Sequence, residues 1–313
     1  MRPILFIFIC CLTLPAWSQK IKEIPFAEDL ARISGNYLFA SKYEVSNRLY
    51  KEFLDSLKKQ GKVVQFNENH PDTLVWKSPL AYNDPYVKYY FRHPAYNEYP
   101  VVGVSHDNVD AFCNWLEDLY NKELAKGEYP ALKVDVRLPT GEEWMKAARG
   151  GLDKTAIYPW GHTGIRSRDK KNQGSMLANF IGGFHENTGN KEALDDNADI
   201  TAPVSSYWPN GYGMYCMSGN VAEMVMEKGI VKGGGWRSRG YYLRIDAVED
   251  RKIYQPPAMD VGFRYFVEVV ELNKNHFKND PLKIDAGYIE KSIVKMNAYQ
   301  WMGTHEVTNR LYA

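Results

Sequence analysis

Apolar residues recur at helical spacing in three stretches of the chain. The first stretch follows Ser46, a residue type that caps helices, and it ends at Lys58, Lys59 and Gly61, which are typical of a helix end. Its apolar face consists of Leu49, Tyr50, Phe53, Leu54 and Leu57. This spacing predicts a helix between Ser46 and Gly61.

The other two helical stretches begin at Ser105 and Thr140. The apolar stripe of the second stretch consists of Val109, Phe112, Leu116 and Tyr120, and Gly127 follows its end. In the third, Thr140 and Glu143 have the spacing of a capping box, and Gly150 stops the helix. The residues expected to face inward there are Trp144, Ala147 and Ala148.

The pattern outside these stretches is irregular. Residues 63–100 are rich in Tyr, Pro, Asn and His, and residues 158–213 are rich in Gly, Asn, Asp and Pro. Short strands are expected at 101–104, 133–137, 229–232 and 263–269. The pattern predicts an α+β domain with much irregular structure, held together by buried aromatic side chains.

The N-terminus has the composition of a signal peptide. A positive charge precedes an apolar run over 4–14, and we expect cleavage after Ser18, so that residues 1–18 are removed. The protein would then be exported and either periplasmic or associated with the outer membrane. Lipidation at Cys10 or Cys11 is the less favoured alternative, because bulky rather than small residues precede them.

A short sequence occurs twice. KYEVSNRLY at 42–50 returns as THEVTNRLY at 304–312. We therefore expect one domain over 19–270, followed over 271–313 by a linker and the truncated start of a second copy.

Composition and charge exclude two function classes. The 313 residues include 39 basic and 38 acidic side chains, so nothing favours nucleic acid as a partner. No apolar run after the signal peptide is long enough to predict a transmembrane span. Only two cysteines, Cys113 and Cys216, lie beyond the signal peptide. A single disulfide between them is one possibility. A buried free thiol is favoured at Cys113, because this residue lies in an apolar helical stretch.

A series of motifs occurs in a characteristic order. They are EVSN, YPVVGVS, RLPTGEEW, YPWG, PNGYGMY, SGNVAE, KGGGW and DVGFR. The series resembles the formylglycine-generating enzyme, or sulfatase-modifying factor, domain over roughly residues 24–268. The resemblance implies the C-type-lectin-like fold of that family, which is α+β with few regular elements. Residues 70–105 further resemble an insert of the gliding-motility lipoproteins J and K of Bacteroidota, which implies a structural part in type 9 secretion.

The resemblance also locates the chemistry of the family, whose catalytic members hold copper between two cysteines. These cysteines match Ser238 and a position near Leu243, and no cysteine follows Cys216. Because copper(I) needs soft thiolate ligands, we expect no copper and assign no catalytic residue.

Calcium is the cofactor that the resemblance favours. One site of the family uses side chains and carbonyls that match Asn179, Phe180, Asp196 and Ala198. Ligation by oxygen alone suits a hard cation. The alternative is that the DDNAD segment is only a solvated acidic loop.

A second calcium site of the family matches Gly219, Val221 and Glu223. Cys216 replaces the oxygen ligand that leads this site in the family, and a neutral thiol is a poor calcium ligand. Glu223 could instead be a buried acceptor for backbone amides.

Residues 232–240 read KGGGWRSRG, which lacks the order of a phosphate-binding P-loop. We expect its glycines to allow close backbone approach, Trp236 to pack, and Arg237 and Arg239 to bind a carboxylate of a partner. A second interface is expected at an aromatic run, in preference to a glycan- or peptide-binding face: Tyr86, Tyr89, Tyr90 and Phe91.

The sequence therefore favours an exported, non-catalytic protein with a structural or assembly role in the cell envelope. Its expected partners are envelope proteins of a secretion or motility complex. The alternative is a metal-dependent enzyme of the same superfamily that acts on exported proteins, and a third interpretation is a lectin-like ligand-binding module.

Overall fold

The computed structural model describes residues 27–35, 37–78, 82–126, 132–180, 198, 200–250 and 257–272. Within them the helices are α2 (Asn47–Lys59), α3 (Val63–Glu68), α4 (Asp84–Tyr89), α5 (His106–Lys126) and α6 (Gly141–Arg149). The strands are β1 (Leu30–Ser34), β2 (Leu38–Ser41), β3 (Leu132–Arg137), β4 (Ala222–Met224), β5 (Ile230–Lys232), β6 (Glu249–Asp250), β7 (Val261–Gly262) and β8 (Phe266–Leu272). Short 3-10 helices lie at Ala27–Asp29, Thr73–Trp76, Pro94–Tyr96 and Gly240–Leu243. The predicted signal peptide and the second copy of the repeat lie outside the described residues.

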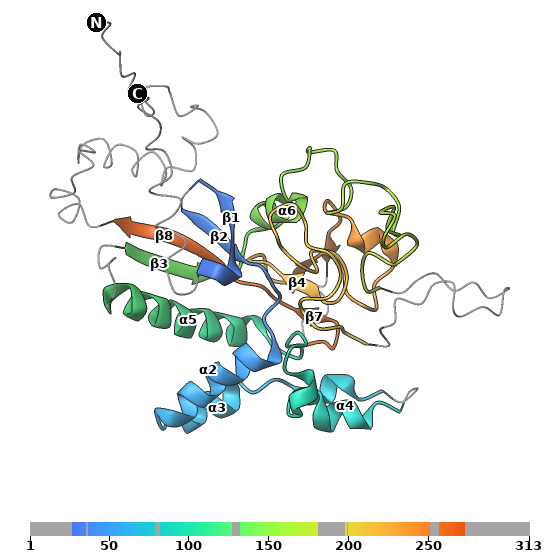
Figure 1. Cartoon of the computed structure of the whole chain (residues 1–313). Coiled ribbons are helices and arrows are strands. Elements are labelled where there is room, and N and C mark those ends of the chain that lie inside the picture. Colours follow the sequence, from blue (N-terminus) through green and yellow to red (C-terminus); the bar gives the residue numbers. More distant parts are fainter. Residues whose placement is uncertain are drawn as a thin grey trace, which may run out of the picture.

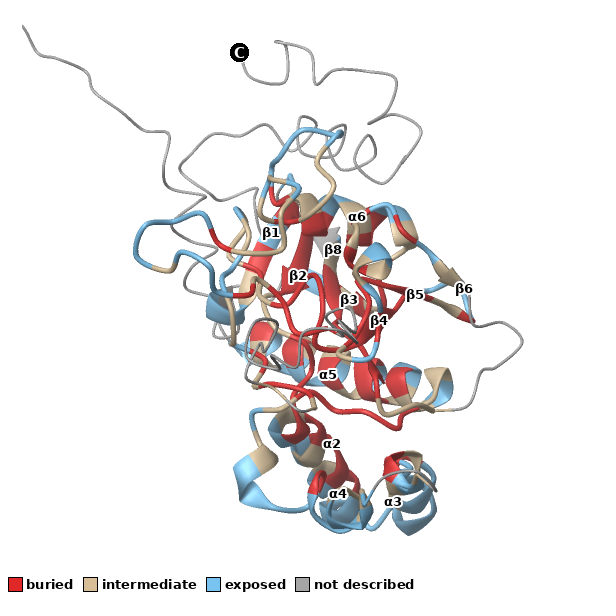
Figure 2. Ribbon diagram, turned by 90° about the vertical axis from the view of Figure 1, so that its right-hand side faces the viewer, coloured by how far each residue is buried: buried red, intermediate tan, exposed pale blue. Residues whose placement is uncertain are grey.

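The larger hydrophobic cores lie on the two faces of an antiparallel sheet with the strand order β1-β2-β8-β3 (Figure 1). Successive side chains of a strand point to opposite faces. Leu38 and Ala40 of β2 accordingly join a core with α6, whereas Phe39 joins a core with α2 and α5. The sheet is therefore buried between helices on both faces, which accounts for the buried strands in Figure 2.

Three helices confirm the predictions from apolar spacing. α2 begins after Ser46, whose Oγ accepts a hydrogen bond from the backbone N–H of Leu49 at 3.3 Å. α6 has the predicted capping box, in which Thr140 and Glu143 each accept a hydrogen bond from the other's backbone N–H, and it ends at Gly150 with φ of +59°. The stripe predicted for α5 is buried along its length. These helices were predictable because their signals are local.

The predicted strands have mixed outcomes. β3 and β5 confirm the strands expected at 133–137 and 229–232, and β8 begins at Phe266 rather than at residue 263. The strand expected at 101–104 is wrong. The chain there makes one isolated bridge, between Ser46 and Pro100, and Gly103 with φ of +76° interrupts the extended conformation. β5 belongs to a second sheet, which has the strand order β6-β5-β4-β7 and in which β4 and β7 are parallel.

The segment 63–100, expected to be irregular, contains α3, α4 and two 3-10 helices. Trp76 and Tyr90 are its buried anchors, with ring centroids 4.5 Å apart. The interface predicted for the aromatic run is wrong for Tyr90 and Phe91, which are buried because Tyr90 packs on Trp76 and Phe91 packs on Tyr50 of α2. Tyr89 of the run is exposed.

Both Cys113 and Cys216 are free and buried. The buried thiol predicted at Cys113 is confirmed, and the disulfide alternative is wrong. Burial raises the pKa of both thiols. Since the thiolate is the reactive form, neither cysteine has the environment of a nucleophile.

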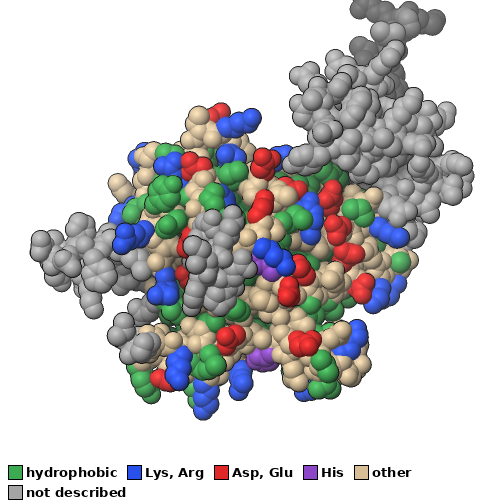
Figure 3. All heavy atoms as spheres, turned by 180° about the vertical axis from the view of Figure 1, so that it is seen from behind, with side chains coloured by type: hydrophobic (Ala, Val, Ile, Leu, Met, Phe, Trp, Pro, Cys, Tyr) green, Lys and Arg blue, Asp and Glu red, His purple; other side chains and the backbone are tan. Residues whose placement is uncertain are grey.

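The surface carries charges of both signs. Figure 3 shows acidic and basic side chains interspersed over the face it presents, in keeping with a formal net charge of +1. Across the described residues, no helix combines the length and the apolar character that a membrane span requires.

Candidate functional site

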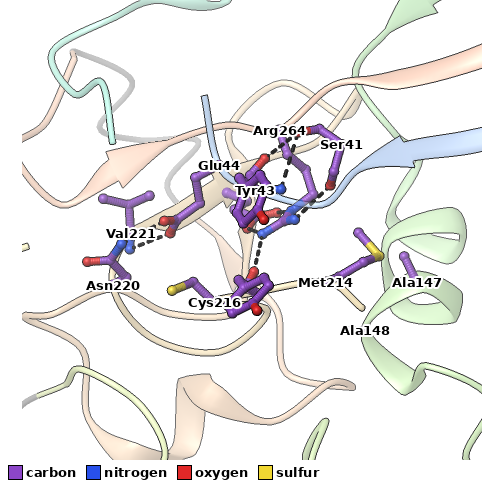
Figure 4. A network of polar contacts seen from close by, with 12 residues as sticks. Ser41, Tyr43, Glu44, Ala147, Ala148, Met214, Cys216, Asn220, Val221 and Arg264 are labelled. Carbon is purple, nitrogen blue, oxygen red and sulfur yellow. Dashed lines mark hydrogen bonds and ion pairs between the residues drawn. The ribbon is translucent and has the colours of Figure 1, made fainter. Parts of the chain in front are cut away.

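A fully buried ion pair joins Glu223 of β4 to Arg264, which lies between β7 and β8. Figure 4 shows Arg264 within the buried polar network. Nε and Nη2 of Arg264 donate to the two carboxylate oxygens of Glu223 in β4 at 2.7 and 2.6 Å. The guanidinium also donates to the carbonyls of Ser41 in β2 and Tyr215, at 3.0 and 2.9 Å. Nε1 of Trp144 in α6 donates to the same carboxylate at 2.7 Å. A buried pair is stable only when its remaining polar groups are hydrogen-bonded, and these contacts provide that.

A second buried carboxyl group, that of Glu44, lies close to this pair (Figure 4). It accepts hydrogen bonds from Nδ2 of Asn220 at 2.6 Å and from the backbone N–H of Val221 at 3.2 Å. Burial, followed by repulsion from Glu223, raises the pKa of Glu44 well above its ordinary value. The group is therefore a neutral hydrogen-bonding partner over a wider pH range than an exposed glutamate.

The glycines of the KGGGW motif lie where side chains would clash. A Cβ on Gly235 would lie 2.6 Å from the carbonyl oxygen of Asp260 and 3.0 Å from the backbone nitrogen of Ala222. A Cβ on Gly233, which has φ of +82°, would lie 2.9 Å from the ring of Trp144. The prediction of close backbone approach is therefore confirmed.

Trp236 packs as predicted. Its backbone N–H donates to the carbonyl of Asn220 at 2.7 Å, and its Nε1 donates to the carbonyl of Met259 at 3.2 Å. Its ring stacks on Trp76, with centroids 6.1 Å apart and an interplanar angle of 17°. The segment 63–100 thus packs directly against the glycine loop.

Ser238 and Leu243, at or near the positions expected for the family's cysteines, have structural roles. Ser238 is buried, and its Oγ accepts a hydrogen bond from the backbone N–H of Gly235 at 3.0 Å. Leu243 is fully buried in a small apolar cluster with Met176, Ala178 and Phe180. The hydroxyl closes the loop on itself, and the isobutyl group fills the space beside it.

Arg237 and Arg239 flank buried Ser238 and are both exposed. The guanidinium of Arg237 lies 5.9 Å from the centroid of the Trp236 ring. Among the described residues, neither arginine forms an ion pair with a carboxylate. Both guanidinium groups are thus available to a partner, and the predicted carboxylate contact stays a prediction.

The residues of the first calcium site lie partly outside the described residues, because Asp196 is not among them. Asn179 is buried, and its Nδ2 donates to the carbonyl of Ile200 at 2.7 Å. The backbone carbonyl of Asn179 accepts a hydrogen bond from the backbone N–H of Asn220 at 2.9 Å. Phe180 is buried beside it, and Ala198 is half-buried. Calcium at this site stays a prediction.

The second calcium site meets a competing arrangement. Both oxygens of Glu223 accept hydrogen bonds from Arg264 and Trp144, so Glu223 is a buried acceptor, although its donors are side chains and not the expected backbone amides. The predicted ligands at Gly219 and Val221 are backbone carbonyls, and the N–H groups of these residues donate to the carbonyl of Gly233 and the carboxyl of Glu44. A cation here would lie beside a guanidinium, which opposes its binding.

Sequence reasoning missed Arg264 and Glu44 as members of the buried network. A signal was present, because each charged residue stands among apolar neighbours in a motif, DVGFR for Arg264 and EVSN for Glu44. Charged residues are almost never buried unless they are paired. The partners of these charged residues could not be predicted, because the contacts join segments that lie far apart in the sequence.

Comparison with known proteins identifies the domain. The family model for the sulfatase-modifying factor enzyme 1-like domain matches residues 25–269. The chain is 36% identical over 128 residues to the formylglycine-generating enzyme of Thermomonospora curvata, a match that covers 40% of this chain and 32% of that protein. It is 27% identical over 231 residues to the mouse protein named inactive C-alpha-formylglycine-generating enzyme 2, which covers 66% of this chain and 59% of that protein.

The matched part is less than two thirds of the length of these curated relatives. Among solved structures, that of CarF has a TM-score of 0.47 and 20% identity, and covers 75% of this chain and 87% of its own. That of PvdO from Pseudomonas aeruginosa has a TM-score of 0.47 and 18% identity, and covers 74% and 80%. The match of the family model confirms the fold class expected from the motifs. The chain belongs to the family of the sulfatase-modifying factor enzyme 1-like domain.

Proposed function

We propose that this chain is a non-catalytic member of its family with a structural or assembly role in the cell envelope. The observation that carries the proposal is the loop after β5. By the motif order, the family's cysteine pair would fall on Ser238 and near Leu243, and both of these side chains are buried in structural contacts. A hydroxyl and an aliphatic side chain offer copper no soft ligand.

One relative is consistent with the loss of catalysis. The mouse protein that is 27% identical to this chain carries the word inactive in its name. Other relatives are named as formylglycine-generating enzymes, so membership of the family alone does not decide the question. The residues at the loop support the non-catalytic assignment.

The finer proposal is a part in gliding motility or type 9 secretion, with envelope proteins as partners. It rests on the likeness of residues 70–105 to the insert of the gliding-motility lipoproteins. In this chain the insert packs on the glycine loop through Trp76 and Trp236. Insert and loop then offer one surface on which exposed Arg237 and Arg239 can meet carboxylates of a partner.

Two experiments test the proposal. Deletion of the gene is expected to impair secretion or surface motility, and normal secretion and motility in the deletion strain would count against the envelope role. Purified protein is expected to carry no stoichiometric copper or iron by elemental analysis, and to leave a cysteine-containing sulfatase peptide unoxidised. Conversion of the cysteine in that peptide to formylglycine would overturn the non-catalytic assignment.

The arginines are tested separately by affinity purification of the tagged chain from its host. The variant Arg237→Ala/Arg239→Ala is expected to lose its envelope partners. The matched control, Lys170→Ala/Lys171→Ala, removes two exposed positive charges outside the loop and is expected to keep them. Equal recovery of partners by the two variants would remove the arginines from the interface while leaving the non-catalytic assignment intact.

A further inference from the structure

A groove of about 730 Å³ lies between α2, α3 and α5, and no residue of the glycine loop lines it. All three helices contribute lining residues, and α2 contacts both α3 and α5. Figure 1 shows the arrangement of the three helices. Its volume falls in the range of small-ligand sites. Its lining is unusual for such a site because polar side chains, many of them uncharged, dominate it: among them are Gln60, Gln65, Asn108 and Asn114.

The charges of the groove favour an uncharged ligand. Two cations on its walls, Lys62 and Lys122, face three anions, Glu68, Asp107 and Asp118. Asp107 pairs at 3.6 Å with Lys228, which lies outside the lining. Apart from that pair, two charges of each sign remain, so a phosphate or a strongly charged peptide would gain no net attraction.

Several polar side chains of the groove have unused hydrogen-bonding capacity. Within the described residues, the side chains of Gln65, Asn114 and Asp118 make no hydrogen bond, and all three are exposed. An amide offers donors and an acceptor side by side, and a carboxylate adds two acceptors. Such a set complements neighbouring hydroxyl groups, each of which both donates and accepts.

The groove also contains a fixed aromatic surface. Trp115 of α5 is half-buried, and its indole packs on Phe53 and Phe112 with centroid distances of 5.7 and 5.6 Å. Its Nε1 donates to none of the described residues. A rigid ring with a free N–H presents both an apolar face and a donor to a ligand. The C–H face of a sugar ring is the matching surface, with hydroxyls at its edge for the amides.

We propose that this groove binds an uncharged oligosaccharide, with Trp115 as the stacking platform and Asn114 and Gln65 as hydrogen-bonding groups. The proposal goes beyond the assembly role and does not depend on it. In an envelope protein the two surfaces would act together, since the groove would hold a glycan while the loop engages a protein.

The full chain is titrated by NMR and calorimetry with three hexaoses: β-1,4-linked glucose, β-1,4-linked N-acetylglucosamine and α-1,4-linked glucose. At least one is expected to bind and to shift resonances of α5 and α3. Trp115→Ala is expected to weaken binding about 10-fold and Asn114→Ala about 5-fold. The matched control is Trp208→Ala, which removes an exposed tryptophan outside the groove and is expected to leave the affinity unchanged.

Circular dichroism identifies a variant that fails to fold. If Trp115→Ala does so, the exposed Asn114→Ala decides the question. Absence of binding by all three hexaoses overturns the proposal, as does unchanged affinity in the folded groove variants. Binding of a peptide panel to the groove in place of the hexaoses overturns it too, and makes the groove a protein-binding site.

Discussion

The buried pair of Arg264 and Glu223 allows a quantitative test of what stabilises the fold. Glu223→Gln keeps the shape of the side chain and one acceptor, but it removes the negative charge and turns an N–H donor toward the guanidinium. The two charged groups are 0% and 1% exposed, so water cannot replace the lost partner. Breaking a buried pair on one side costs about 3–5 kcal/mol of unfolding free energy.

Urea denaturation of the full chain, followed by circular dichroism, measures this cost. The control is Glu52→Gln, which breaks a pair with Arg48 at 3.6 Å whose side chains are both 55% exposed. That pair spans one turn of α2, and its loss is expected to cost about 0.3–0.5 kcal/mol. A loss below about 1 kcal/mol in Glu223→Gln, similar to the control, would refute the reasoning that the burial of the pair makes it important.

Three further tests follow from the same geometry, each read by urea denaturation. The pKa of Glu44 is raised in the folded state, so the folded protein holds the proton of this carboxyl group more tightly than the unfolded chain does. The contribution of Glu44 to the unfolding free energy is therefore largest below the ordinary pKa of a glutamate, about 4.3, and it falls as pH rises through the raised pKa. The unfolding free energy of the wild type should therefore fall relative to that of Glu44→Gln between pH 5 and pH 8, and a difference independent of pH would contradict this. Gly235→Ala places a Cβ 2.6 Å from a backbone carbonyl oxygen and is expected to lower the unfolding free energy by about 1–3 kcal/mol. The control, Gly164→Ala, meets only ordinary van der Waals contacts and should change the unfolding free energy little. Equal losses in the two variants would contradict the predicted clash at Gly235. Thr140→Ala removes the cap of α6 and is expected to cost about 1 kcal/mol, while an unchanged midpoint would mean that the cap is dispensable.

The parts of the fold that could be predicted from sequence are those fixed by local signals. A cap such as Ser46 and a stripe such as that of α5 act within a few residues, so spacing alone places the helix. The strand expected at 101–104 failed because apolar residues there are buried by neighbouring segments without a ladder of their own. A buried apolar run does not distinguish a strand from an extended segment that passes through the core.

The site shows the same limit more sharply. The motif order located the glycine loop, because the loop depends on residue identity at matched positions, while the positions of the missing thiols stay a prediction. The partners of Glu223 and Glu44 could not be found in this way. Arg264 lies 41 residues after Glu223 along the chain, and Glu44 lies 176 residues before Asn220. Such contacts follow from the packing of the two sheets, which one sequence does not specify by pattern.

The conformation of the glycine loop depends on close packing and on hydrogen bonds, one of which is accepted by the hydroxyl of Ser238. Gly235 must pass close to Asp260, and Trp236 is fixed by Asn220, Met259 and Trp76.

At Ser238 and Leu243, at or near the expected cysteine positions, the side chains present add stabilising contacts. The hydroxyl of Ser238 satisfies a buried N–H, and Leu243 fills an apolar cluster with Phe180. A site that depended on metal ligation for its structure would be expected to collapse when its thiols were lost. In this chain the loop is held by packing and hydrogen bonds with a hydroxyl at Ser238, and Arg237 and Arg239 are exposed on it.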